Sequence, residues 1–190
     1  MSAGSVKITR MTWIVAIVLL GTLLWGIVSF NRLVRDRHRV AQAWSDVGVQ
    51  LKRRHDLIPK LVETVRQYAS YEGALLEHVT ELRARGINES TPAGLGPIEG
   101  SLADGINRVF AVAEQYPELK ASENFLDLQR NLTEVETQIQ YARRYYNGAV
   151  NNLNTRIDTF PDLLVARVFG FTAAEYFEPE PAAAARLPES

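Results

Sequence analysis

The chain has 190 residues, a formal net charge of −1 and no cysteine. Without cysteine, neither disulfide bonds nor thiolate metal sites nor a thiol nucleophile can form. The balanced charge and the absence of a recognisable binding motif argue against nucleic-acid binding.

The first predicted element is an apolar helix at residues 11–31, which contain no charged residue. At 1.5 Å per residue such a helix spans about 30 Å, the thickness of the hydrocarbon core of a bilayer. Trp13, Trp25 and Phe30 lie near its ends, where aromatic residues anchor membrane helices. The run is too long for a cleavable signal, and no small-x-small cleavage site follows. The pattern predicts a retained single-pass transmembrane helix after a short N-terminal tail, residues 1–10.

Basic residues gather directly after this helix, at Arg32, Arg35, Arg37 and Arg39, whereas only Lys7 and Arg10 precede it. Positive charge resists translocation, so the asymmetry predicts a cytoplasmic domain, with a periplasmic domain as the alternative. The four arginines are also candidate contacts for anionic lipid headgroups. Their role in topology alone is the simpler interpretation.

A heptad spacing of apolar residues continues out of the membrane from Leu33 to Leu82. It predicts that the same helix runs on to about Arg85. Pro59 should kink this helix, and Gly48 should weaken it. The following stretch, residues 86–100, is rich in glycine and proline and is expected to form an exposed loop.

A shorter helix is expected from Ile98 to Ala113, followed by a second long helix over residues 122–160. In that second helix apolar residues recur every three or four positions from Phe125 to Phe160, and Ser122 is a suitable N-cap. Pro161 should end it.

The last predicted elements follow Pro161. The apolar residues from Leu163 to Phe177 predict a short helix-turn-helix around Gly170, with a capping box at Thr172 and Glu175. Residues 179–190 are expected to form a disordered tail.

Apolar stripes on helices can be buried only against one another. The sequence therefore predicts an all-α fold: an N-terminal transmembrane helix that continues into an antiparallel helical bundle, residues 32–178, with three main helices and a short C-terminal helical segment. About 160 residues after the membrane helix are enough for one domain.

Residues that could carry chemistry are few. His38, His55 and His78 are too scattered to bind a metal ion, and neither an HExxH motif, a GxSxG elbow nor a Walker lysine is present. No catalytic, cofactor-binding or metal residues are therefore expected, and the protein is predicted not to be an enzyme.

A polar cluster at Arg53, Arg54 and Asp56 is the first candidate interaction surface. Arg53 and Asp56 can pair on one helix face, whereas Arg54 falls on the apolar seam and needs a carboxylate, for which Glu134 and Glu136 are candidates. The cluster could dock a partner, or it could fix the register of the bundle.

A second candidate surface lies on another face of the last long helix and contains Tyr141, Arg144, Tyr145 and Asn152. Tyrosine and arginine are enriched at protein interfaces. Packing against the short helix would explain these residues equally well.

Several blocks of sequence together resemble the LemA family. The first blocks are Trp44-Ser45, the run Val49-Gln-Leu-Lys-Arg-Arg-His-Asp-Leu-Ile-Pro59 and Leu61-Val-Glu-Thr-Val65. The others are Ala142-Arg-Arg-Tyr-Tyr-Asn147, Phe160-Pro161, Phe169-Gly-Phe171 and Glu175-Tyr-Phe177. Gly48, Gly148 and His55 depart from the family pattern. The resemblance implies a bacterial, membrane-anchored α-helical domain without an established biochemical activity, and it brings no catalytic residues.

The leading hypothesis is a single-pass scaffold or adaptor at the bacterial cell (inner) membrane, which binds a protein partner and no cofactor. Homo-oligomerisation stays open, because heptad seams serve equally within and between chains. A second hypothesis is lipid contact or membrane shaping by residues 32–39 and the apolar residues 160–177. An unrecognised hydrolase is a remote third.

Overall fold

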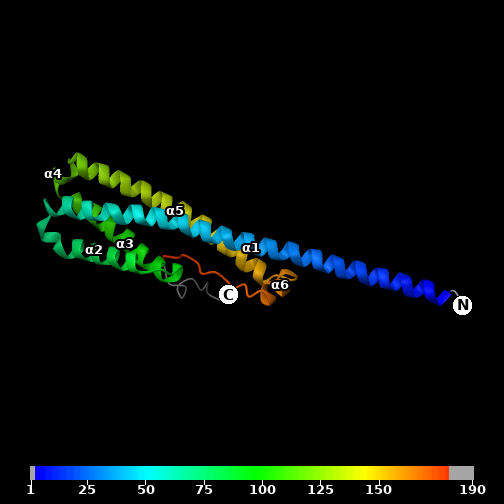
Figure 1. The fold of residues 1–190 in the computed structure, drawn as a ribbon. Helices are drawn as coiled ribbons and strands as arrows, with labels where there is room; N and C mark the ends of the chain where they lie inside the picture. Colours follow the sequence, from blue (N-terminus) through cyan, green and yellow to red (C-terminus); the bar gives the residue numbers. More distant parts are fainter. Residues whose placement is uncertain (1–2, 180–190) are drawn as a thin grey trace, which may run out of the picture. The chain divides into compact units, whose positions relative to one another are not determined.

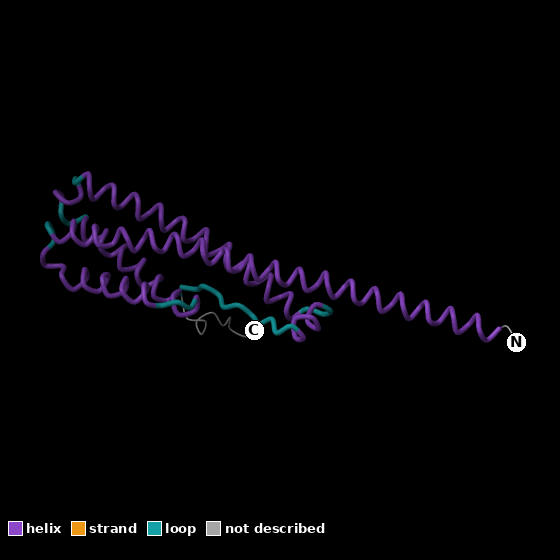
Figure 2. The backbone as a smooth tube through the Cα atoms, in the orientation of Figure 1, coloured by secondary structure: helices purple, strands orange, loops and turns teal. Residues whose placement is uncertain are grey.

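The computed structural model describes residues 3–179, and these form helices, turns and irregular connections without a strand (Figures 1 and 2). The predicted all-α class is confirmed. In chain order the elements are α1 (Ala3–Arg66), the 3₁₀ helix η1 (Ser70–Glu72), α2 (Gly73–Asn88), α3 (Pro92–Ala113), α4 (Pro117–Lys120), α5 (Glu123–Asp158) and α6 (Asp162–Val168). The predicted tail lies outside the described residues except for Pro179.

The chain divides into two compact units, which share the long helices α1 and α5. Unit 1 contains α1 up to Val40 together with Asn151–Ala174, and unit 2 contains Ala41–Val150 and the chain from Glu175 onward. Unit 1 has a small core around Leu33, Leu153 and Val165. The larger core of unit 2 collects side chains from α1 to α5, among them Leu61, Val79 and Leu132.

Helix α1 contains, from Met11 onward, a stretch that is long and apolar enough to cross a membrane, by length and composition. The helix continues through Gly48 and Pro59. It ends at Arg66, so the predicted continuation to Arg85 is wrong. The backbone leaves helical geometry at the buried Ala69 (φ −120°, ψ 58°). Residues before and after this turn pack into one core. The heptad spacing of apolar residues therefore continues across the turn and does not indicate where α1 ends.

Residues 92–100 are helical, so the loop predicted at residues 86–100 is also wrong. Helix α3 begins with Thr91 as N-cap, whose hydroxyl accepts a bond from the Gly94 N–H at 3.2 Å, and with Pro92 in the first turn. These are favourable N-terminal residues, because the N–H that proline lacks has no helical partner there. The glycines of this stretch serve close packing instead of a turn.

Helix α5 confirms the predicted seam over most of its length. Phe125, Leu132, Val135, Ile139 and Leu153 are buried, and the carbonyl of Ser122 accepts the bond from the Leu126 N–H at 3.0 Å. The helix ends at Asp158, and Phe160, expected on the seam, is exposed. The prediction for Phe160 is therefore wrong.

The predicted second helix after Gly170, with its capping box at Thr172 and Glu175, is absent, because residues 171–178 are not helical. Gly170 has a φ of +68°, the left-handed conformation that glycine adopts without strain. The Phe171 N–H bonds the Ala166 carbonyl at 2.9 Å and the Gly170 N–H bonds the Arg167 carbonyl at 3.4 Å. This is the Schellman ending of a helix, so the chain leaves α6 in extended form.

Candidate functional site

The polar site of unit 2 starts from Pro59 in α1. Proline has no N–H, so the carbonyl of His55 one turn earlier lacks its helical donor. Arg83 of α2 supplies the missing bond: its Nε donates to the His55 carbonyl oxygen at 2.7 Å. Pro59 therefore creates a point at which α2 attaches to the backbone of α1.

The side chain of His55 turns the other way, toward α3. Its Nε2 lies 2.7 Å from Oε1 of Glu99, and both residues are buried. Gly86 of α2 passes so close that an added Cβ would lie 2.7 Å from that Glu99 oxygen and 3.3 Å from Nε2 of His55. A residue without a side chain is thus needed at position 86.

Arg54 completes the cluster and is only 2% exposed. Its Nη1 donates to Oε2 of Glu99 at 2.9 Å and to the Glu99 carbonyl at 3.2 Å, while Nη2 pairs with Glu136 of α5. Burial lowers the pKa of the Arg54 guanidinium from its ordinary value, and the Glu99 carboxylate opposes this shift. Of the two carboxylates that were candidates for Arg54, Glu136 pairs with it, whereas Glu134 pairs with Arg53.

We call the residues Arg54, His55, Glu99 and Glu136 the core polar cluster. Both carboxylate oxygens of Glu99 are engaged, one by His55 and one by Arg54. Within residues 3–179 no three His, Asp or Glu side chains are grouped as metal ligands. The geometry of the cluster is that of an ionic connection between three helices.

The other residues of the first candidate surface are exposed. Asp56 pairs with Lys52 at 3.1 Å, and Arg53 pairs with Glu134 of α5 at 3.3 Å, so the expected Arg53–Asp56 pair is not formed. A hollow of about 380 Å³ lies beside His55 and is lined in part by Lys52, Asp56 and Ile87. Arg53 and Asp56 therefore face solvent, whereas Arg54 does not.

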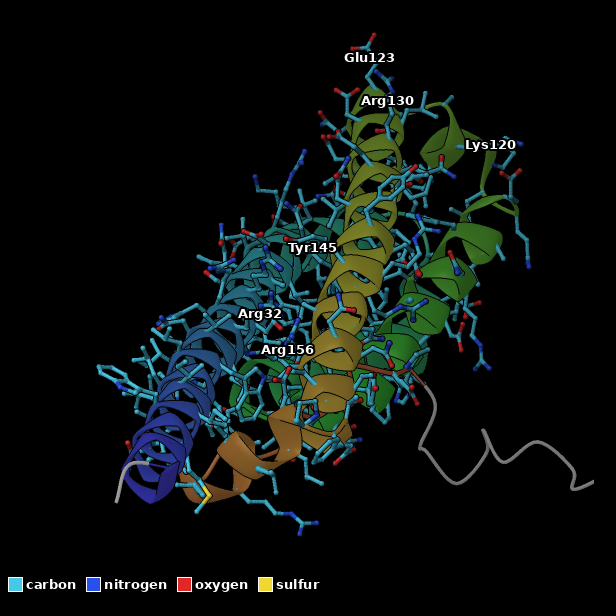
Figure 3. The ribbon with its side chains drawn as sticks, turned by 90° about the vertical axis from the view of Figure 1, so that its right-hand side faces the viewer. Arg32, Lys120, Glu123, Arg130, Tyr145 and Arg156 are labelled. Carbon is cyan, nitrogen blue, oxygen red and sulfur yellow. The ribbon has the colours of Figure 1, made fainter. Side chains whose placement is uncertain are left out.

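The second candidate surface lies on α5. Tyr141 and Tyr145 are exposed, and Tyr145 is labelled on α5 in Figure 3. The guanidinium of Arg144 stands 4.8 Å from the centre of the Tyr141 ring, a cation–π contact. Asn152, also exposed, lies in the part of α5 that belongs to unit 1. The two tyrosines and Arg144 thus form one aromatic and basic patch, which we call the tyrosine patch.

Within unit 2 an extended segment, residues 175–179, packs against α1 and α5, and this contact was not anticipated. Phe177 is buried, and its ring centre lies 5.6 Å from that of Trp44, whose ring in turn lies 5.0 Å from that of Tyr146. The Asn147 side chain accepts from the Phe177 N–H at 3.0 Å and donates to the Phe177 carbonyl at 3.1 Å. The segment is therefore held through its backbone as well as through one aromatic ring.

Tyr146 adds a further bond to this segment, because its hydroxyl donates to the Glu175 carbonyl at 2.8 Å. Burial, with a smaller contribution from Glu175, raises the pKa of Tyr146 to about 12. The hydroxyl therefore stays protonated and able to donate at neutral pH. The sequence signal for this contact was the asparagine that directly follows the two tyrosines.

In unit 1 the four arginines after the apolar stretch are all exposed, and Arg32 lies on α1 (Figure 3). Arg39 is 3.4 Å from Asp36, and Arg37 stands 5.4 Å from the centre of the Phe171 ring. Arg32 and Arg35 have no ion pair within the described residues. All four remain available to a negatively charged surface.

A second arginine cluster lies beside them. Nε of Arg156 on α5 donates to Asp36 of α1 at 2.7 Å, and Nη1 donates to Asp162 of α6 at 3.2 Å. Ser29 donates to the other Asp162 oxygen at 2.6 Å. The hydrogen bond with Asp36 is the main cause that raises the pKa of Arg156.

Comparison with known proteins gives a family and several relatives. The model of the LemA family matches residues 43–189. The chain is 26% identical over 192 residues to the magnetosome protein MamQ 2 of Paramagnetospirillum magneticum, covering 87% of this chain and 70% of the relative. It is 28% identical over 134 residues to Protein LemA of Metamycoplasma hominis, covering 68% and 60%. For MamQ of Magnetospirillum gryphiswaldense the identity is 23% over 212 residues, covering 96% and 76%.

Proposed function

Because the chain belongs to the LemA family, we propose that it is a membrane-anchored scaffold without catalytic activity, which binds a protein partner beside the bacterial inner membrane. The names of the relatives mention the magnetosome or the family and state no reaction. The proposed domain spans residues 32–178 as an antiparallel helical bundle. The exposed tyrosine patch is the observation that carries the proposal.

The membrane anchor is residues 11–31. Its support is the apolar stretch of α1, whose large side chains, such as Ile14, Leu19 and Leu23, are mostly exposed to solvent and thus require an apolar surrounding. The arginines at positions 32, 35, 37 and 39 favour a cytoplasmic domain.

Orientation can be tested because the natural chain has no cysteine. Thr133→Cys, at an exposed position of α5, provides a single reactive thiol for a membrane-impermeant maleimide. A cytoplasmic domain stays unlabelled in intact spheroplasts and is labelled after lysis. Labelling of intact spheroplasts would instead place the domain in the periplasm.

The tyrosine patch is the proposed docking surface. Its two aromatic rings are rigid and amphipathic, and Arg144 is held over one of them, so a partner would meet a preorganised contact. Nothing in the core of unit 2 requires these side chains, because the buried residue of this stretch is Tyr146. A partner with an acidic or aromatic contact region fits this chemistry.

The test uses a photo-crosslinking amino acid at Tyr145 in the full-length protein in its own membrane. The matched control carries it at Thr133, which is exposed on the same helix about three turns before Arg144 and so lies outside the tyrosine patch. We expect a discrete adduct from position 145 that is lost with Arg144→Glu and absent from position 133. Equal adducts at both positions, or none at either, would contradict the proposal.

A further inference from the structure

Helix α6 in unit 1 is apolar on two faces. Its sequence, Asp-Leu-Leu-Val-Ala-Arg-Val, contains few polar residues. Val165 and Ala166 are buried in the core of unit 1 with Leu33 and Ile157. The opposite face is open: Leu164 is 52% exposed and Val168 is 78% exposed. The open face of α6 is therefore an apolar surface that the described residues do not cover.

The residues at both ends of α6 extend this open apolar face. Phe160 before the helix is 73% exposed, and Phe169 after it is 61% exposed. Large apolar residues that gather in one surface patch mark contact with a partner or a membrane. The patch thus comprises Phe160, Leu164, Val168 and Phe169, and we call it the α6 patch.

The position of α6 within unit 1 is fixed by contacts at both of its ends. Asp162 at its start is bonded by Ser29, and the ring of Phe169 at its end lies 4.8 Å from the ring of Phe30. Because Ser29 and Phe30 are adjacent, both ends of α6 meet the same turn of α1. The helix therefore crosses α1, and it does so at the last turn of the apolar stretch.

Continuity with that stretch identifies what covers the patch. Phe169 joins Trp25, Gly26 and Phe30 of α1 in lining an apolar groove of about 620 Å³. The adjacent exposed side chains are basic: Arg32 and Arg35 on α1 and Arg167 on α6. Apolar residues at the end of a spanning helix, bordered by arginines, match the acyl chains and anionic headgroups of one leaflet.

We propose that α6 is an interfacial helix that inserts the α6 patch into the membrane leaflet at the C-terminal end of the spanning segment. The inference rests on the proposed membrane anchor. The α6 patch is a second lipid contact besides the spanning helix. It sets the depth of that helix in the membrane and its rotation about its own axis. The basic residues lie at the level of the headgroups.

Site-directed spin labelling of the full chain tests this, since the protein has no native cysteine. Val168→Cys carries the nitroxide, and the labelled protein is reconstituted into vesicles of phosphatidylcholine and phosphatidylglycerol. Its collision rates with oxygen, which concentrates in lipid, and with a water-soluble nickel chelate are compared. The matched control is Thr172→Cys, at an exposed polar residue of the non-helical segment after α6 in the same unit, and Leu19→Cys reports on the anchor.

We expect the label at position 168 to collide at least several-fold more with oxygen relative to nickel than the label at position 172. Equal nickel exposure at 168 and 172, with position 19 still protected, would overturn the α6 proposal while the anchor stands. Nickel exposure at position 19 would overturn the anchor itself. Dipolar broadening at 168 that disappears on dilution with unlabelled protein would show that a second copy, and not lipid, covers the patch.

Discussion

Arg54 and Arg156 each connect one long helix to carboxylates on two other helices. In unit 2, Arg54 of α1 bonds Glu99 of α3 and Glu136 of α5. In unit 1, Arg156 of α5 bonds Asp36 of α1 and Asp162 of α6. Their pKa values move in opposite directions, because burial dominates at Arg54 and the hydrogen bond with Asp36 dominates at Arg156.

The difference shows that similar ion pairs contribute unequally to stability. The side chains of Arg54 and Glu99 are both 3% exposed, so removal of one partner leaves the other charge buried away from water, with Glu136 as the counterion that remains to Arg54. The Arg156 side chain is 30% exposed, so water can replace a lost carboxylate. Asp36 is itself buried, at 6% side-chain exposure, but its partner Arg156 reaches water. We therefore expect the loss of Glu99 to destabilise the fold far more than the loss of Asp36.

The largest expected effect is that of Glu99→Leu. It leaves Arg54 with only the half-exposed Glu136 and removes the acceptor of the His55 ring. Loss of one partner of a buried pair costs about 3–5 kcal/mol of unfolding free energy. Urea unfolding of the full chain in detergent, followed by circular dichroism, measures it. Glu134→Ala, which breaks the exposed pair with Arg53, is the control and should cost less than about 1 kcal/mol.

Removing both charges sharpens the same comparison. Arg54→Met combined with Glu99→Leu should recover most of the stability that Glu99→Leu alone loses, since no uncompensated buried charge remains. A double variant as unstable as the single one would show that the cluster stabilises the fold by more than mutual neutralisation.

The next effect is expected at Gly86. Gly86→Ala places a methyl group 2.7 Å from the Glu99 carboxylate, which is too buried to move aside, and should cost about 1–3 kcal/mol. Gly48→Ala is the matched control: its Cβ meets nothing within 4 Å, so it should stabilise α1 by up to about 1 kcal/mol. Thermal unfolding of both variants compares them. Equal shifts of the unfolding temperature in the two variants would contradict the steric clash expected at position 86.

Replacement of Arg83 is expected to have a smaller effect on the free energy of unfolding, and this effect depends on Pro59. Arg83→Met keeps the aliphatic stem but leaves the His55 carbonyl without a donor, at a cost of about 1–2 kcal/mol. After Pro59→Ala, a helical N–H is restored at position 59, so the same Arg83→Met change should cost less. The double-mutant cycle measures this coupling, and strict additivity of the two changes would contradict the assignment.

The smallest effect is expected in unit 1. Asp36→Ala should cost about 1 kcal/mol, because Arg156 keeps Asp162 and gains water. The loss should also shrink in high salt, which screens exposed charges more than buried ones. If Asp36→Ala were as harmful as Glu99→Leu in the same unfolding assay, burial would not be the property that separates the two clusters.

The sequence correctly predicted the helical structure of those parts of the molecule in which one spacing of apolar residues continues without interruption. The apolar seam of α5 was visible, and with it the carboxylate of Glu136 that pairs with Arg54. Glu99 was missed because glycine and proline near the start of α3 were interpreted as loop formers. The Thr91-Pro92 pair was the signal for a helix start, and Leu95, Leu102 and Ile106 continue its buried face.

Two other features had no local signal. The turn after Arg66 lies inside an intact heptad pattern. The backbone of Ala69 and the long-range bond from Arg83 to the His55 carbonyl distinguish it from a continuous helix, and the spacing of apolar residues indicates neither. Residues 175–177 were expected to be helical and Pro179 to belong to the tail, because the space left by the glycines of α3 cannot be foreseen from the spacing of apolar residues. At Gly96 an added Cβ would lie 1.9 Å from the Glu178 carbonyl oxygen.

Asn147 holds Phe177 through main-chain atoms that every amino acid possesses. The side chains at most neighbouring positions of this segment can therefore change during evolution without weakening these main-chain hydrogen bonds. Two positions do depend on the identity of the side chain: position 177, where an aromatic ring is buried, and position 96, where a methyl group would meet the Glu178 carbonyl. Sequence drift in relatives should consequently spare these two points while the residues around them diverge freely.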